Sequence, residues 1–151
     1  MAAAGVNVAL GCDGTSAWGS FDMTVQVHLV AGLYKDARMD PHVIPAGQAL
    51  EMATINGARA LLWDDEIGSL EPGKKADLIL FDLDRPEWTP CHDPVQTLVY
   101  SASGRSVHTV LIDGRVVLEN YRLTTMDEGE ILAAARRTAE KLARECGLAR
   151  P

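Results

Sequence analysis

Asp13 is the residue whose type and position are best suited to chemistry. It lies just beyond residues 5–11, a short and nearly all apolar run that is typical of a strand buried on both faces of a parallel sheet. A carboxylate at the carboxyl end of such a strand can ligate a divalent metal, and it can take a proton from a water that attacks the substrate. An aspartate beside Gly14 is also common in turns, so position alone leaves both interpretations open.

Trp18 is a second candidate, because it lies in the polar, glycine-rich loop 12–20, where its indole could stack on a flat heteroaromatic ring. The alternative is an indole packed within a loop closed by hydrogen bonds. The three cysteines are far apart and suggest neither a disulfide framework nor a thiolate zinc site. The spacing of a metal-ligand set is also missing from the four histidines, His28, His42, His92 and His108.

The segment around Asp13 is predicted to form one strand, loop and helix unit. Apolar residues recur at helical spacing from about 22 to 36, and Asp22 is interpreted as the helix N-cap rather than as a ligand. Pro45 can open a second helix over 46–54, and a further turn or two is predicted over 58–63. This part of the chain therefore belongs to the α/β class.

Beyond residue 66 the pattern changes to short apolar segments separated by turn residues. Pro72-Gly73 marks a tight turn between strands, and Asp113-Gly114 between two apolar runs predicts a β-hairpin. Residues from about 65 to 120 are predicted to form a small β module with a helical turn over 94–100. Thr125 and Glu128 fit a capping box that opens a long terminal helix ending at Gly147. The apolar stripe of this helix must bury against another surface.

The composition excludes several classes of partner. The 14 Lys and Arg against 21 Asp and Glu leave a formal net charge of -7, which does not favour binding to nucleic acid or to anionic lipid. No apolar run approaches the roughly 20 residues of a membrane-spanning helix, and the sequence does not open with the basic segment of a secretory signal. We therefore expect a soluble cytoplasmic protein whose partner is a small molecule or another protein.

Several motifs, taken in order, resemble a known family. The stretches 8–14, 49–61 and 67–79 read VALGCDG, ALEMATINGARAL and IGSLEPGKKADLI, and the likeness continues through 92–94, 98–100 and 110–116. Together they resemble the amidohydrolase superfamily, and within it the branch of cytosine deaminases and triazine hydrolases. The resemblance covers nearly the whole chain.

The resemblance implies a metal-dependent hydrolase that acts on C–N or C–Cl bonds of a small heterocyclic substrate. It implies a (β/α)8 barrel, a β-sandwich assembled from both ends of the chain, and a homo-oligomer in the complete protein. Asp13 matches the aspartate after the eighth barrel strand, which in that family binds the metal and moves the hydrolytic proton. The metal implied is a single divalent ion, zinc with iron as the alternative, and its histidine ligands are absent from this sequence.

A barrel takes roughly 250 residues, so these 151 residues are expected to supply only the last βα unit. We expect 1–64 to be the end of the barrel, 65–120 part of the sandwich, and 121–151 a helix that packs back on the barrel. Met1–Ala4 is interpreted as a start imposed upstream of the last barrel strand. The chain alone should be inactive. The alternative is a non-catalytic assembly module that associates with a separate barrel-forming chain.

Overall fold

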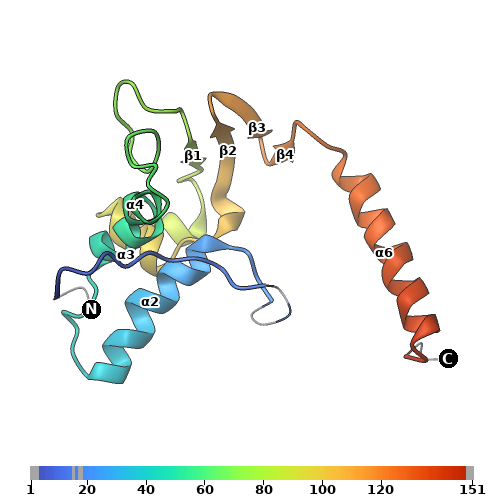
Figure 1. The fold of residues 1–151 in the computed structure, drawn as a ribbon, viewed down its shortest axis with the longest axis horizontal. Helices are drawn as coiled ribbons and strands as arrows, with labels where there is room; N and C mark the ends of the chain where they lie inside the picture. The colour runs from blue at the N-terminus through green and yellow to red at the C-terminus, as the bar shows by residue number, and fades with distance from the viewer. Residues whose placement is uncertain (1–3, 15, 17–18, 149–151) are drawn as a thin grey trace.

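The computed structural model describes residues 4–14, 16 and 19–148 (Figure 1). It contains one small antiparallel sheet, a group of helices beside the sheet, and one helix that stands apart. The helices are α2 (Met23–Arg38), α3 (Ala46–Ala53), α4 (Ile55–Ala60), α5 (Pro94–Tyr100) and α6 (Glu128–Glu145), with short 3-10 turns η2 (Pro86–Trp88) and η3 (Gly104–Ser106). The strands are β1 (Leu78–Phe81), β2 (Val107–Ile112), β3 (Arg115–Glu119) and β4 (Arg122–Leu123).

Helices α2, α3 and α5 pack on one another and hold the hydrophobic core. The predicted N-cap is confirmed, because Asp22 Oδ1 accepts a hydrogen bond of 2.9 Å from the Thr24 backbone N–H at the start of α2. Small side chains at the centre let the three helices approach closely. These core residues are Val27, Ala31, Ala46, Ala49 and Val99.

The four strands form one sheet in the order β1-β2-β3-β4, with every neighbouring pair antiparallel. The predicted hairpin is confirmed at the turn between β2 and β3. Asp113 and Gly114 have φ values of 50° and 73°, the left-handed conformation that a two-residue hairpin turn requires. Phe81 of β1 packs on Trp88, with ring centroids 5.5 Å apart, and Trp88 is buried. The predicted strands are thus present as a single sheet between Leu78 and Leu123, while the division of the chain at residues 65 and 120 stays a prediction.

The strand predicted over 5–11 is absent from the described residues, so this prediction is wrong for the structure. Residues 6–14 follow an irregular path, and Val6 is 53% exposed. A strand of a parallel sheet needs neighbouring strands to satisfy its backbone groups. The hydrogen bond that holds Leu10 runs instead from its N–H to the carbonyl of Met52 in α3, at 2.8 Å.

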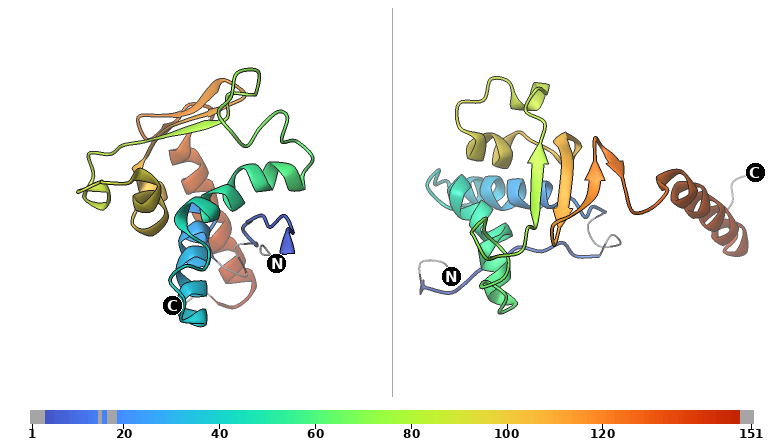
Figure 2. Two further views of the ribbon diagram at one scale, coloured as in Figure 1. Left: turned by 90° about the vertical axis from the view of Figure 1, so that its left-hand side faces the viewer. Right: turned by 90° about the horizontal axis from the view of Figure 1, so that it is seen from above.

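The terminal helix α6 forms as predicted but begins differently. Its N-cap is Asp127, whose side chain accepts a hydrogen bond of 3.0 Å from Glu130 N, and not the predicted Thr125. Figures 1 and 2 show α6 extending away from the other helices beyond β4. None of its described residues is buried, and Leu142 is 53% exposed. The packing of this helix on a barrel therefore stays a prediction.

The structure is a mixed α/β fold, as the sequence predicted at the level of class. Within residues 4–14, 16 and 19–148, no helix is long and apolar enough to cross a membrane.

Candidate functional site

Asp13 lies on the exposed surface, in the segment 11–14, which forms neither helix nor strand. Its Oδ1 accepts a hydrogen bond of 2.6 Å from the backbone N–H of its own neighbour, Gly14. Residues 13 and 14 form no turn, so an aspartate that shapes a turn is not confirmed, and the bond to Gly14 leaves the carboxylate accessible for other partners. Trp18, the predicted substrate contact, lies outside the described residues.

The segment that carries Asp13 is attached to α3 and α4 by hydrogen bonds. Besides the bond from Leu10 to Met52, the side-chain amide of Asn56 donates to the carbonyl of Val8 at 3.1 Å. In return, the side-chain amide of Asn7 donates to the Asn56 carbonyl at 3.0 Å. Asn56 lies in the motif 49–61, but its contact with residues 7 and 8 was not predicted from the sequence.

Two further contacts, one before Asp13 and one after it, involve α2. The sulfur atoms of Cys12 and Met23 lie 3.4 Å apart. Asp22, the cap of α2, also accepts a hydrogen bond of 3.2 Å from the backbone N–H of Gly104, the first residue of η3. Cys12 is thus in contact with α2, and the start of α2 is joined to η3.

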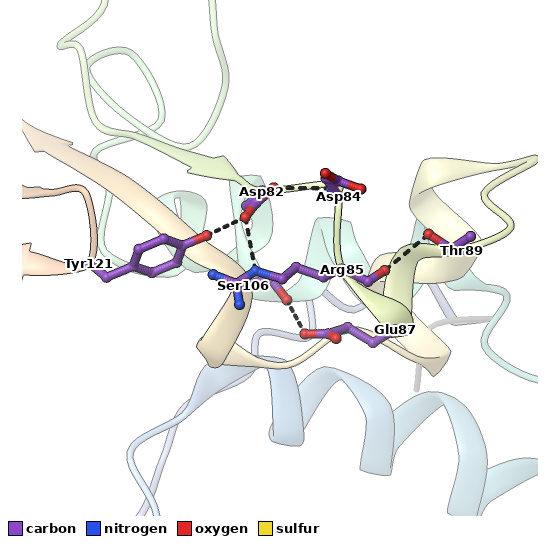
Figure 3. A network of polar contacts seen from close by, with 7 residues as sticks. All are labelled: Asp82, Asp84, Arg85, Glu87, Thr89, Ser106 and Tyr121. Atoms are coloured by element: carbon purple, nitrogen blue, oxygen red, sulfur yellow. Dashed lines mark hydrogen bonds and ion pairs between the residues drawn. The ribbon is translucent and has the colours of Figure 1, made fainter.

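A second group of titratable side chains lies between the end of β1 and η3 (Figure 3). Asp82 Oδ2 accepts hydrogen bonds from the Tyr121 hydroxyl and, at 2.9 Å, from Arg85 Nε. The Arg85 guanidinium carbon lies 4.7 Å from the centroid of the Tyr121 ring. Nearby, the buried Ser106 hydroxyl donates to Glu87 Oε1 at 2.6 Å. These side chains bind one another, which indicates a structural network that joins the end of β1 to the turn between β3 and β4, and η2 to η3.

The network makes the stability of the chain dependent on pH. The Tyr121 hydroxyl, followed by the Asp84 N–H and Arg85, lowers the pKa of Asp82 below its ordinary value. The stabilisation is therefore present above the unfolded pKa of about 3.9 and is lost as the pH falls through the lower, folded pKa.

We expect Tyr121→Phe to weaken this acid dependence, because phenylalanine keeps the ring against Arg85 but removes the hydrogen bond to Asp82. Urea unfolding near neutral pH and at about pH 3 measures the effect. The wild-type chain should lose more free energy of unfolding between the two conditions than the variant. Tyr34→Phe is the control, since Tyr34 is 50% exposed. Equal losses in wild type and Tyr121→Phe would contradict the prediction.

The Lys74 side chain holds a loop together by hydrogen bonds. The Lys74 side chain is only 13% exposed. Its Nζ donates to the carbonyl of Asp64 at 2.6 Å and to the Ser69 hydroxyl at 2.7 Å. Pro72-Gly73 does form a turn, but the turn precedes β1 rather than joining two strands. Trp63, close to this loop in the sequence, is 58% exposed.

A family model identifies the class of protein to which this fold and this segment belong. The model of the amidohydrolase family matches residues 1–117. The chain therefore belongs to the amidohydrolase family, as the sequence motifs indicated.

The relatives of this chain include deaminases and a chlorohydrolase. The 5-methylthioadenosine/S-adenosylhomocysteine deaminase of Syntrophomonas wolfei is 47% identical over 142 residues, which cover 94% of this chain and 33% of the relative. A solved adenosine deaminase from Xanthomonas campestris, with bound zinc, has a TM-score of 0.91 at 36% identity, covering 95% of this chain and 33% of that one. Atrazine chlorohydrolase from Arthrobacter aurescens, complexed with zinc, has a TM-score of 0.82 at 28% identity, covering 90% and 30%.

The chain thus spans about a third of the length of these relatives. Both solved relatives contain zinc, and a protein zinc site takes three or four ligands. In the part of the chain that the structure describes, no three His, Cys, Asp or Glu side chains gather to form such a site. Asp13 could supply one ligand, so these residues do not hold zinc by themselves.

Proposed function

We propose that this chain is part of a metal-dependent hydrolase that deaminates a purine nucleoside or a related heterocycle. The observation that carries the proposal is the 47% identity to the Syntrophomonas wolfei deaminase over 94% of the chain. Identity to the atrazine chlorohydrolase is 28%, so hydrolysis of a C–N bond is favoured over hydrolysis of a C–Cl bond. In the complete hydrolase, residues 1–64 would end a (β/α)8 barrel and 65–120 would form part of a β-sandwich.

Asp13 is proposed as the catalytic residue of this part of the chain. Its exposed carboxylate would supply one ligand to a divalent metal, zinc in preference to iron, whose other ligands lie outside these 151 residues. The same carboxylate can accept the proton of an attacking water and pass it to the departing amine. The accessibility of Asp13, whose described side-chain contact is with its own neighbour Gly14, supports this assignment. Trp18 is proposed to stack on the heterocycle.

The proposal can be tested by a chimera in which this chain replaces the similar third of the Syntrophomonas wolfei deaminase. We expect the chimera to bind zinc and to deaminate S-adenosylhomocysteine, which is measured by the change in ultraviolet absorbance of the purine. The unmodified relative is the positive control. A folded chimera that binds zinc but leaves the nucleoside unchanged would contradict the proposed substrate class.

The 151-residue chain on its own is expected to retain no stoichiometric zinc after dialysis and to show no deaminase activity, because a single carboxylate cannot close a zinc site. Metal analysis by mass spectrometry measures the zinc content. One equivalent of zinc per chain would contradict this prediction and would point to a ligand set among the 151 residues.

A second candidate function, a non-catalytic assembly module, is favoured by an exposed apolar surface. Strand β1 is an edge of the sheet, and its residues Ile79 and Leu80 are 52% and 51% exposed although they point to opposite faces. A shallow apolar groove of about 330 Å³ continues from β1 to α5. An edge strand of this kind is suited to pairing with another strand. A chimera that folds but binds no zinc would favour this module over the hydrolase.

A further inference from the structure

We propose that Asn56 is a positioning residue that fixes the segment carrying Asp13 against α3 and α4. The inference rests on the proposed role of Asp13 and goes beyond it, because it names the side chain that determines where that carboxylate lies.

Both polar atoms of the Asn56 side chain, Nδ2 and Oδ1, form a hydrogen bond. Its Nδ2 donates to the Val8 carbonyl at 3.1 Å, and its Oδ1 accepts a hydrogen bond of 3.1 Å from a guanidinium nitrogen of Arg59, one turn further along α4. Because the oxygen faces Arg59, the amide N–H groups are directed toward Val8. The Asn56 backbone carbonyl accepts from Asn7, so a single residue holds the segment at two adjacent positions.

The two glycines near Asp13 add no packing contact, so among its close neighbours only Cys12, whose sulfur lies 3.4 Å from that of Met23, makes one in the described residues. Gly11 and Gly14 have no side chains, and a Cβ atom at Gly11 would have no atom within 4 Å. A Cβ atom at Gly14 would meet only the Ser16 hydroxyl oxygen, at 3.7 Å. Before Asp13, the segment is attached by the hydrogen bonds at residues 7, 8 and 10, by the packing of Leu10 against the core, and by the contact of Cys12 with Met23. A displacement of these residues along α3 and α4 would be passed on to Asp13.

The contact requires asparagine. Aspartate has the same shape and can still accept from Arg59, but it has no N–H and would place a charged oxygen against the Val8 carbonyl. Alanine removes both side-chain hydrogen bonds. Asn56→Asp is thus the informative variant, because it changes the interaction with Val8 while it leaves the volume and the Arg59 contact in place.

The first test measures amide hydrogen exchange in the 151-residue chain, without any metal. We expect Asn56→Asp to speed exchange of the Leu10 amide about 5- to 10-fold, since Leu10 N–H bonds to Met52 in the segment that Asn56 holds. Asp93→Ala is the matched control: Asp93 caps α5 by accepting from Val95 and Gln96, so the variant weakens a helix cap on α5. An unchanged Leu10 exchange rate in Asn56→Asp would overturn the proposal.

The second test separates positioning from a merely structural role by steady-state kinetics of the chimera. We expect Asn56→Asp to lower kcat by up to about 100-fold with KM nearly unchanged, because a small displacement of a catalytic group acts on the chemical step. Asp93→Ala should leave kcat unchanged. If Asn56→Asp has no larger effect on kcat than Asp93→Ala, the proposal is wrong.

The two proposals fail in different ways. If Asp13→Asn abolishes turnover while Asn56→Asp is neutral in both tests, the role of Asp13 stands and positioning by Asn56 is excluded. If Asp13→Asn leaves turnover intact, the proposed role of Asp13 is wrong, and no catalytic group remains for Asn56 to position.

Discussion

Asp13→Asn should reduce turnover of the chimera about 10²- to 10⁴-fold, the range typical for loss of a general acid-base group. Asparagine cannot accept the proton of the attacking water, and its neutral oxygen is a weaker metal ligand than a carboxylate. The fold should be unaffected, because asparagine Oδ1 can still accept the hydrogen bond of 2.6 Å from Gly14 N. Steady-state kinetics and circular dichroism measure the two effects.

The control for this variant is Asp65→Asn, which removes the same charge from another exposed aspartate of the same chain. It should leave kcat and KM unchanged. Near-normal turnover in Asp13→Asn would remove Asp13 from the mechanism. An equal loss of turnover in both variants would leave a general effect of net charge as the explanation.

Gly68→Ala is expected to give the largest loss of stability. Gly68 has a φ of 93°, and a Cβ atom there would lie 2.7 Å from the Cβ of Ala58 and 3.0 Å from the Cα of Ile55, both in α4. A left-handed conformation costs a residue with a Cβ about 1–2 kcal/mol, and overpacking typically adds about 1–3 kcal/mol. We therefore expect the free energy of unfolding to fall by about 2–5 kcal/mol, as measured by urea denaturation.

Gly73→Ala separates the two causes. Gly73 has a φ of 94°, but a Cβ atom there would have nothing within 4 Å. This variant should therefore lose only the conformational part, and the difference between the variants measures the clash with α4. Equal losses would show that the clash is relieved by a small movement of α4. Because Asn56 follows Ile55 in α4, such a movement would also reach the contact with Val8.

The helices and the hairpin could be predicted because their signals are local. Asp22 and the helical spacing of apolar residues place the start of α2, and Pro94 with Asp93 before it marks α5. Asp113-Gly114 determines its hairpin by the conformation of two residues. In each case, the physical cause lies within a few residues of the element.

The predictions fail where the structure of a segment depends on residues outside that segment or where two residues could play the same role. Residues 5–11 have the composition of a buried strand, but pairing needs neighbours, and in the described residues their backbone contact is with Met52 of α3. At α6, Thr125 and Asp127 both carry side chains that can cap a helix, and the sequence pattern could not rank them. The role of Asp77 in the motif 67–79 could not be predicted either, because its Oδ1 accepts a hydrogen bond of 2.6 Å from the Asp113 N–H, 36 residues away.

For the candidate site, the sequence could predict Asp13 but not the residues that hold it. An aspartate after an apolar run and between glycines is a recognisable pattern. The attachment by Asn56 depends on a contact over 48 residues, and nothing in the local sequence distinguishes this amide from an exposed one.

The position of Val99 determines where the gene for this protein could be split without breaking the hydrophobic core. Val99 of α5 is buried with Val27 of α2 and Ala49 of α3, so a single core draws on both sides of residue 64. A break in the gene near the codon for residue 64 would give two products, and each would carry only part of the hydrophobic core. Recombination between members of the family that exchanges this stretch whole should therefore keep the core intact.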